Sequence, residues 1–240
     1  MKIIASNFKT NHTRKSTLQF CQELESFLTK IESQSQSLPH QITIFPPQTA
    51  LLENRFKGFQ VGAQNAYPAR NGSYTGEIGL EQLEEFAVTT LLVGHSERRE
   101  ILKESQEFCA EKFKFFSNLG FTIYYCIGES QAIRQQGVEA TLEFLESELS
   151  GIDLNDSNLI VAYEPIWAIG SGVSASLEEI TQIHTRLKQK LGKIPLLYGG
   201  SVKPQNVRQI LSINGVDGVL VGSASWEISS FCQILENSLF

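Results

Sequence analysis

Short apolar runs alternate with amphipathic helical patterns from one end of this 240-residue chain to the other. The eight runs are 3–8, 42–45, 59–63, 88–93, 121–127, 159–163, 194–198 and 216–221. They are continuously apolar, as parallel strands buried on both faces should be. Apolar residues three and four apart follow each run and predict a helix, as Leu24, Leu28 and Ile31 do after the first.

Eight strand–helix units in a chain of this length fit a closed (β/α)8 barrel, which usually has about 250 residues. A doubly wound open sheet is the alternative. We see no composition shift or linker that would mark a second domain. We therefore predict an α/β fold, a TIM barrel that occupies residues 1–240 as a single domain.

Composition narrows the possible partners and the cellular compartment. The net charge of −6 gives no reason to expect nucleic acid or an acidic membrane surface as a partner. The four cysteines form no C-x-x-C pair, so we interpret them as buried thiols in a reducing compartment. The N-terminal apolar run is too short for a signal peptide, and no run approaches transmembrane length. We expect a cytoplasmic protein.

In such a barrel the active groups come from the carboxyl ends of the strands and from the loops that follow them. In chain order these positions are Asn7 and Lys9, Gln64–Asn65, His95–Ser96–Glu97, Gly128–Glu129, Glu164, Gly199–Gly200–Ser201 and Gly222–Ser223. A carboxylate, a histidine, a lysine and two loops of small residues would therefore meet at one mouth.

Glu164 directly follows the sixth apolar run. Pro165 fixes the direction of the backbone, Trp167 supplies apolar cover, and Gly170–Gly172 provides a flexible far end. This arrangement is typical of a general base beneath a loop that closes over it and excludes water. The alternative is a surface loop with an exposed glutamate.

His95 precedes a predicted helix start at Ser96, and a helix N-terminus disfavours a charged imidazole. A neutral imidazole that donates a hydrogen bond is therefore plausible, although a lone histidine is often structural. We expect His184 to be packed within an apolar helical stripe and His12 and His40 to be exposed.

Two loops of small residues, Gly199–Ser201 and Gly222–Ser225, follow the seventh and eighth strands and precede predicted helices. This is the usual phosphate site of barrel enzymes, because backbone N–H groups can approach an anion there. Ordinary tight-turn chemistry is the alternative. The glycines of 170–175 match the spacing of a dinucleotide-binding motif, but they begin beyond the strand tip where such a motif would lie. There is also no Walker A loop, and the histidines are too scattered to form a metal cluster. We expect no cofactor and no metal.

Seven motifs together resemble the triosephosphate isomerase family, in family order and through the whole chain. They are Asn7–Phe8–Lys9, Gly62–Ala63–Gln64–Asn65, Tyr74–Thr75–Gly76–Glu77–Ile78, Val93–Gly94–His95–Ser96–Glu97–Arg98–Arg99, Cys126–Ile127–Gly128–Glu129, 162–170 and Tyr198–Gly199–Gly200–Ser201–Val202. The resemblance implies interconversion of dihydroxyacetone phosphate and D-glyceraldehyde 3-phosphate through an enediolate.

The same resemblance assigns roles at the mouth. Glu164 would shuttle a proton between two carbons, and neutral His95 would polarise the carbonyl and move protons between the oxygens. Lys9 and Asn7 would stabilise the oxyanion. The phosphate would be held by backbone N–H groups of Gly170, Ser201, Gly222 and Ser223, and the lid would be 165–175.

Glu97, with Ser96 beside it, would support Lys9 from behind. Three residues depart from the family pattern: Phe8 replaces a tryptophan, Val173 a lysine and Ser223 a glycine. The first two concern packing and the rim of the lid. Ser223 affects the phosphate loop, where its N–H is still available.

The long polar connection 65–79 carries Tyr67 and Tyr74, which would be costly to leave in water. By resemblance it inserts into a second subunit of a homodimer, with Thr75 reaching the neighbour's residues 7–9. The rival is a self-packed loop on an active monomer.

Two other functions remain open from the sequence. One is another sugar-phosphate barrel enzyme of aldolase or epimerase type, where an aldolase would need a desolvated lysine and Lys9 is the strand-end candidate. The other is an inactive barrel that binds a phosphorylated ligand.

Overall fold

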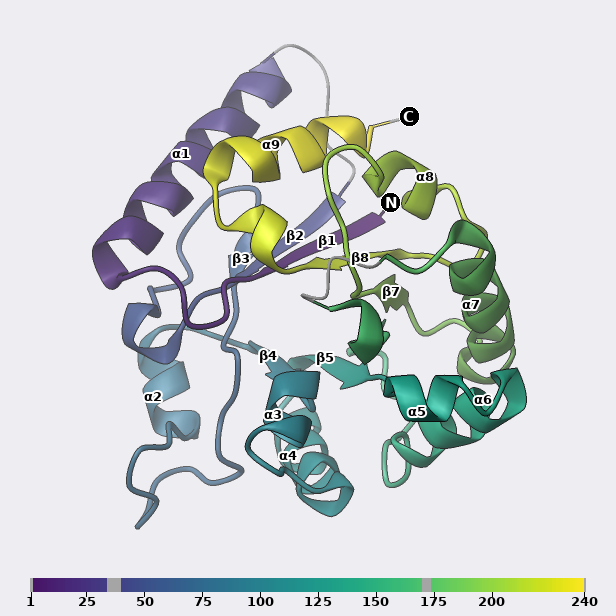
Figure 1. Ribbon diagram of the computed structural model, residues 1–240. Coiled ribbons are helices and arrows are strands. Elements are labelled where there is room, and N and C mark those ends of the chain that lie inside the picture. The colour runs from purple at the N-terminus through teal and green to yellow at the C-terminus, as the bar shows by residue number, and fades with distance from the viewer. Residues whose placement is uncertain (1, 34–39, 170–173, 240) are drawn as a thin grey trace.

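The computed structural model describes residues 2–33, 40–169 and 174–239. Its strands are β1 (Lys2–Asn7), β2 (His40–Phe45), β3 (Gln60–Val61), β4 (Thr90–Val93), β5 (Thr122–Ile127), β6 (Leu159–Tyr163), β7 (Leu196–Tyr198) and β8 (Gly218–Val221). They pair in parallel in the order β3-β2-β1-β8-β7-β6-β5-β4 (Figure 1).

The two ends of this sheet meet through Ala63. Its N–H donates to the carbonyl of Thr90 at 2.9 Å, and its own carbonyl accepts from the N–H of Leu92 at 2.9 Å. These bonds join the chain after β3 to β4 and close the barrel. The predicted (β/α)8 barrel is confirmed, and the open doubly wound sheet is excluded.

Helices connect the strands and surround the barrel (Figure 1). They are α1 (Arg14–Ser33), η1 (Gln48–Ala50), α2 (Leu80–Glu85), α3 (Ser96–Glu100), α4 (Gln106–Ser117), α5 (Gln131–Arg134), α6 (Val138–Ser147), η2 (Ile166–Ala168), α7 (Leu177–Leu191), α8 (Val207–Leu211), η3 (Ser223–Ser225) and α9 (Ile228–Asn237). No helix in the described residues is both long enough and apolar enough to cross a membrane.

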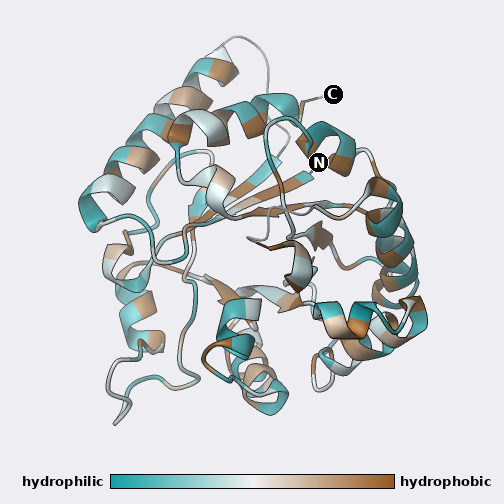
Figure 2. Cartoon of the chain, viewed as in Figure 1, coloured by the Kyte–Doolittle hydropathy of each residue, from teal (hydrophilic) through white to brown (hydrophobic). Residues whose placement is uncertain are grey.

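The core has an inner and an outer part, because successive strand residues face opposite sides of the sheet. Ala5, Phe45, Leu92 and Tyr124 belong to the cluster that fills the barrel interior. A larger cluster lies between the strands and the apolar faces of the helices, whose hydrophilic faces point outward (Figure 2). The interior is therefore packed, and the space for a ligand lies at its mouth.

The histidines outside the mouth differ in part from expectation. His184 is fully buried on α7, as predicted. The predicted exposure of His12 and His40 is wrong, because both are half-buried and hydrogen-bonded. His12 Nε2 lies 2.9 Å from the carbonyl of Trp226, and His40 Nε2 lies 2.8 Å from Ser238 Oγ.

Candidate active site

Glu164 is the first residue after β6, and its side chain is only 2% exposed. Its N–H donates to the carbonyl of Ile127 on β5 at 2.8 Å. Gly128 permits this close approach, since a Cβ there would lie 1.9 Å from the Glu164 carbonyl oxygen. A Cβ on Gly199 would likewise lie 2.9 Å from Glu164 Cγ. Glycines at two neighbouring strand ends therefore make room for the carboxylate.

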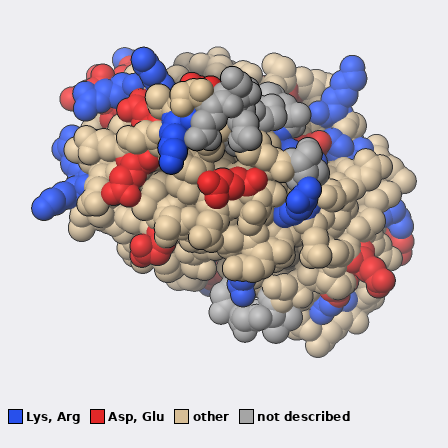
Figure 3. Space-filling model, turned by 90° about the horizontal axis from the view of Figure 1, so that it is seen from above, with Lys and Arg blue, Asp and Glu red and all other residues tan. Residues whose placement is uncertain are grey.

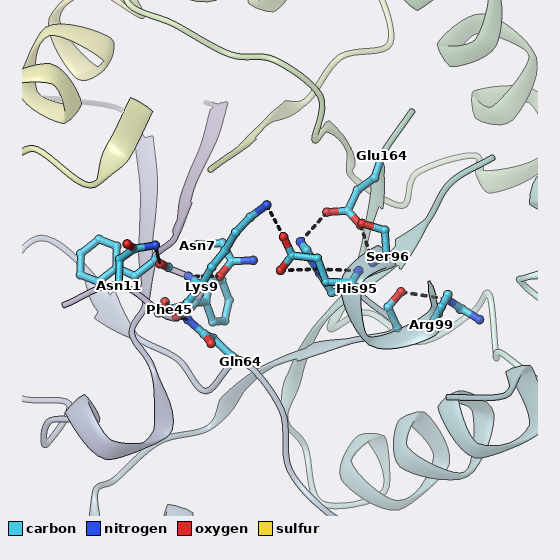
Figure 4. Close-up of polar contacts among 12 residues, drawn as sticks. Asn7, Lys9, Asn11, Phe45, Gln64, His95, Ser96, Arg99 and Glu164 are labelled. Atoms are coloured by element: carbon cyan, nitrogen blue, oxygen red, sulfur yellow. Dashed lines mark hydrogen bonds and ion pairs between the residues drawn. The ribbon is translucent and has the colours of Figure 1, made fainter. Parts of the chain in front are cut away.

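His95 occupies the N-cap of α3 and brings its imidazole to this carboxylate (Figure 4). His95 Nε2 lies 3.0 Å from Glu164 Oε1. The second oxygen, Oε2, accepts the N–H of Ser96 at 3.0 Å. The two oxygens of Glu164 thus have separate partners, and both come from the start of the same short helix.

The tautomer of His95 follows from its other nitrogen. Nδ1 accepts the backbone N–H of Glu97 at 3.2 Å, so the ring proton is on Nε2 and points at Glu164. A second proton would have to break that bond, which favours the neutral ring. Burial also opposes the charged ring, but the adjacent carboxylate of Glu164 outweighs burial and raises the pKa of His95.

Burial opposes ionisation of Glu164 as well. The His95 ring, the Ser96 N–H and the ammonium of Lys9 outweigh burial and lower the pKa of Glu164. The lowered pKa favours the ionised carboxylate, which is the state that a general base requires.

Lys9 reaches the same mouth from the loop after β1. Its φ of 53° is in the left-handed region, which costs a non-glycine residue about 1–3 kcal/mol. Neighbouring side chains hold this backbone: the Lys9 N–H donates to Asn7 Oδ1 and the Lys9 carbonyl accepts from Gln64 Nε2, both at 2.9 Å. Lys9 Nζ lies 2.6 Å from Glu97 Oε1 (Figure 4). The structure thus joins Lys9 to Glu97, and through it to the helix of His95.

The small-residue loops line the same cavity, which has a volume of about 650 Å3. Its wall includes Asn7, Lys9, His95, Glu164, Gly199, Gly200, Ser201, Gly222 and Ser223. The sequence-predicted site residues in the described part of the chain therefore meet at one mouth, with Ser96 and Glu97 directly behind. Gly170 lies outside the described residues, as do Val173 and the rest of the predicted flexible far end, Gly170–Gly172.

Both loops precede a helix, as predicted, but the first reaches its helix only after a turn, because α8 starts at Val207. This turn is closed by Asn206, whose Oδ1 accepts the Lys203 N–H at 2.7 Å and whose side-chain amide donates to the Ser201 carbonyl at 3.0 Å. By contrast, η3 begins at Ser223, so the second loop does lead directly into a helical turn.

Sequence reasoning gave no role to Glu129, although it placed this residue at a strand end. Glu129 is buried, and its Oε1 accepts from Trp167 Nε1 at 2.7 Å and from the Tyr163 hydroxyl at 3.2 Å. Burial raises the pKa of Glu129 despite these donors. It therefore anchors the chain on both sides of Glu164. Its position at a strand end could have marked Glu129 as a candidate, but the residues it contacts depend on the fold.

The described residues contain no group of three or more His, Cys, Asp or Glu side chains that could hold a metal ion. The chemistry at the mouth is that of an acid–base pair with a nearby cation. Because these ionisable groups meet at the carboxyl ends of the strands, the protein belongs to the class of (β/α)8-barrel enzymes.

Comparison with known proteins narrows this class. The family model described as triosephosphate isomerase matches residues 2–238. This chain belongs to the triosephosphate isomerase family. The triosephosphate isomerase of Wolinella succinogenes is 54% identical over 235 residues, covering 98% of this chain and 99% of that protein. Those of Helicobacter hepaticus and a Sulfurovum species are each 53% identical, covering 99% and 97% of this chain and 100% and 99% of theirs.

Proposed function

We propose that this protein is an isomerase that interconverts dihydroxyacetone phosphate and D-glyceraldehyde 3-phosphate by proton transfer through an enediolate. The buried contact of 3.0 Å between Glu164 and His95, at the mouth of a barrel of this family, carries the proposal. It joins a carboxylate to a ring nitrogen that donates a hydrogen bond, and aldose–ketose isomerisation needs both a base and a donor.

The reaction begins when Glu164 removes a proton from the carbon next to the substrate carbonyl. The electron pair of the broken C–H bond forms the enediolate double bond, and the carbonyl oxygen takes the negative charge. His95 donates from Nε2 to that oxygen, because Nδ1 already accepts the N–H of Glu97. His95 then moves a proton between the two oxygens: the former carbonyl oxygen gains one, and the hydroxyl on the adjacent carbon loses one and takes the negative charge. Glu164 returns its proton to the former carbonyl carbon, where the electrons of the double bond form the new C–H bond. The charged oxygen becomes the new carbonyl. For these steps Glu164 leaves the Ser96 N–H and the substrate oxygens take its place at His95.

Lys9 and the small-residue loops bind the negative charge of the substrate. Lys9 and Asn7 together stabilise the oxyanion. A cation that is already fixed in place stabilises a developing negative charge most effectively where water is excluded. Backbone N–H groups of Ser201, Gly222 and Ser223, with Gly170, hold the phosphate. Such local donors are needed because the net charge of −6 repels an anionic substrate. On the face seen in Figure 3, acidic and basic side chains are interspersed, so this face has no broad basic patch that would attract the substrate.

The environment of Lys9 argues against a Schiff-base aldolase. That chemistry needs a neutral amine in a desolvated pocket. Lys9 instead contacts the Glu97 carboxylate at 2.6 Å, so its side chain has a charged partner rather than an apolar pocket. The buried Lys112 is on α4, outside the barrel, and it pairs with Glu104. A merely phosphate-binding barrel would have no use for the buried pair of Glu164 and His95.

The homodimer and the cytoplasmic location belong to the same proposal. In the connection 65–79, Tyr67 stacks on Tyr74 at 3.9 Å, yet Tyr74 is still 43% exposed. Ile101 and Leu102, after α3, are 72% and 60% exposed. We propose that a second copy covers these apolar side chains, with Thr75 against the neighbour's residues 7–9. Free, largely buried cysteines support a reducing compartment.

A coupled assay of triose phosphate isomerisation tests the proposed function. We expect Glu164→Gln to lower kcat by at least about 10²-fold, since a positioned general base contributes about 10²–10⁴-fold. The matched control is Glu139→Gln, which changes an exposed carboxylate paired with Arg186 and should leave turnover unchanged. An inactive wild-type protein would refute the proposed function, and a Glu164→Gln variant with near-normal turnover would remove Glu164 from the mechanism.

A further inference from the structure

His12 links the loop that carries Lys9 to the loop after β8. It lies between Lys9 and the start of α1, and its Nε2 is 2.9 Å from the carbonyl oxygen of Trp226. A carbonyl only accepts, so His12 donates from Nε2 and its tautomer is fixed. The contact joins positions 214 residues apart in the sequence.

Trp226 ends the helical turn that Ser223 begins. Trp226 is the C-cap of η3, and its own N–H donates to the carbonyl of Ser223 at 3.2 Å. A second link lies deeper, where Ser6 Oγ donates to Ser225 Oγ at 2.7 Å in a buried position. The end of β1 and the proposed phosphate-binding turn are therefore joined at two depths, and His12 forms the outer link.

Aromatic packing fixes the ring of His12. It stacks on Phe8 with centroids 4.3 Å apart and meets the edge of Phe20 at 5.9 Å. The backbone of His12 has a φ of 75°, in a region that histidine adopts more readily than most residues. The stacking on Phe8 holds the plane of the ring in which Nε2 reaches the carbonyl of Trp226.

The side chain of Lys9 lies close to the loop after β8. A Cβ on Gly222 would be 3.7 Å from Lys9 Cε, so the lysine side chain passes over the residue that precedes η3. The distance between the Lys9 ammonium and the Ser223 N–H therefore depends on how the two loops are fixed against each other. A triose phosphate would contact both groups at once, with its oxyanion at one and its phosphate at the other.

We propose that His12 is a positioning residue that sets Lys9 in register with the phosphate-binding turn. This inference rests on the proposed function, because it assigns both ends of one substrate to these loops. Loss of the donated hydrogen bond lets the turn move relative to Lys9. The cost falls on binding of the phosphorylated substrate, while the pair of Glu164 and His95, on other strands, keeps its geometry.

The test compares three His12 variants with the wild-type protein. His12→Phe keeps the ring and its stacking but loses the donor. His12→Asn suits a positive φ but is too short to reach Trp226. His12→Gln can still place an amide N–H near the carbonyl. For Phe and Asn we expect KM for triose phosphate and the inhibition constant of inorganic phosphate to rise together by about 3- to 10-fold, the effect of one hydrogen bond, with kcat within about 2-fold. Gln should restore both constants to within about 2-fold.

His40→Phe is the matched control. It removes the hydrogen bond of another half-buried histidine, to Ser238, at the start of β2 and so at the opposite end of the barrel. We expect it to lower the melting temperature without changing either constant. Wild-type constants in both His12→Phe and His12→Asn would overturn the inference, as would an equal rise in His40→Phe. An inactive wild-type protein whose phosphate affinity, measured by calorimetry, still falls in the His12 variants would refute the proposed function alone.

Discussion

Acid should destabilise this protein through His184, a residue far from any reaction chemistry. Its Nδ1 lies 3.1 Å from the carbonyl of Gly215 and donates to it, while its buried Nε2 has no partner in the described structure. The rings of Tyr163 and Tyr198 lie beside it at 5.8 Å and 6.3 Å. A second proton would place an unpaired charge among these groups. Burial accordingly lowers the pKa of His184 to about 4.

The sign and size of the effect follow from this pKa. Between about pH 6.5 and pH 4 the unfolded chain binds a proton at His184 that the folded chain does not. The stability is therefore complete above pH 6.5 and is lost as the pH falls towards 4. From pH 7 to pH 5 the free energy of unfolding should decrease by about 2 kcal/mol because of this group.

Other groups also titrate in this range, so the effect of His184 must be measured as a difference between the wild type and a variant that lacks this histidine. Burial raises the pKa of Glu148 to about 7, which acts in the opposite direction, because stability from that group is lost as the pH rises from 4.5 through 7. The assay is urea unfolding of wild type and His184→Phe at pH 7 and pH 5, with the protein concentration fixed. The wild type should lose about 2 kcal/mol more than the variant over that interval. An equal loss in both proteins would refute the reasoning.

Two further predictions concern assembly and the buried charges of α4. Thr75→Arg should shift the protein towards monomer in sedimentation and lower activity in parallel by misplacing Lys9; a fully active monomer would contradict the coupling. Glu104→Gln should lower the free energy of unfolding by about 3 kcal/mol in urea, because buried Lys112 loses its charge partner. The control Glu84→Gln, in an exposed pair, should change it by less than about 1 kcal/mol; equal effects would count against burial as the cause.

Most of the secondary structure was predictable because each part of it is encoded locally. Leu159–Tyr163 has no polar alternation, so it had to be a strand buried on both faces. The spacing of Leu24, Leu28 and Ile31 required a helix with one apolar side. Position at a strand end was enough to select Glu164 and His95 as candidates, because parallel strands in a barrel all end at the same mouth.

The contacts between distant segments were decided by the tertiary structure alone. Glu164 and His95 are 69 residues apart in number, and their distance of 3.0 Å depends on the order and register of β4, β5 and β6. The half-burial of His12 could not be predicted from the sequence for the same reason, because its partner Trp226 is near the other end of the chain. Sequence periodicity fixes which face of an element is buried. Which side chain it meets there depends on how the closed barrel brings separate loops together, and no local pattern contains that information.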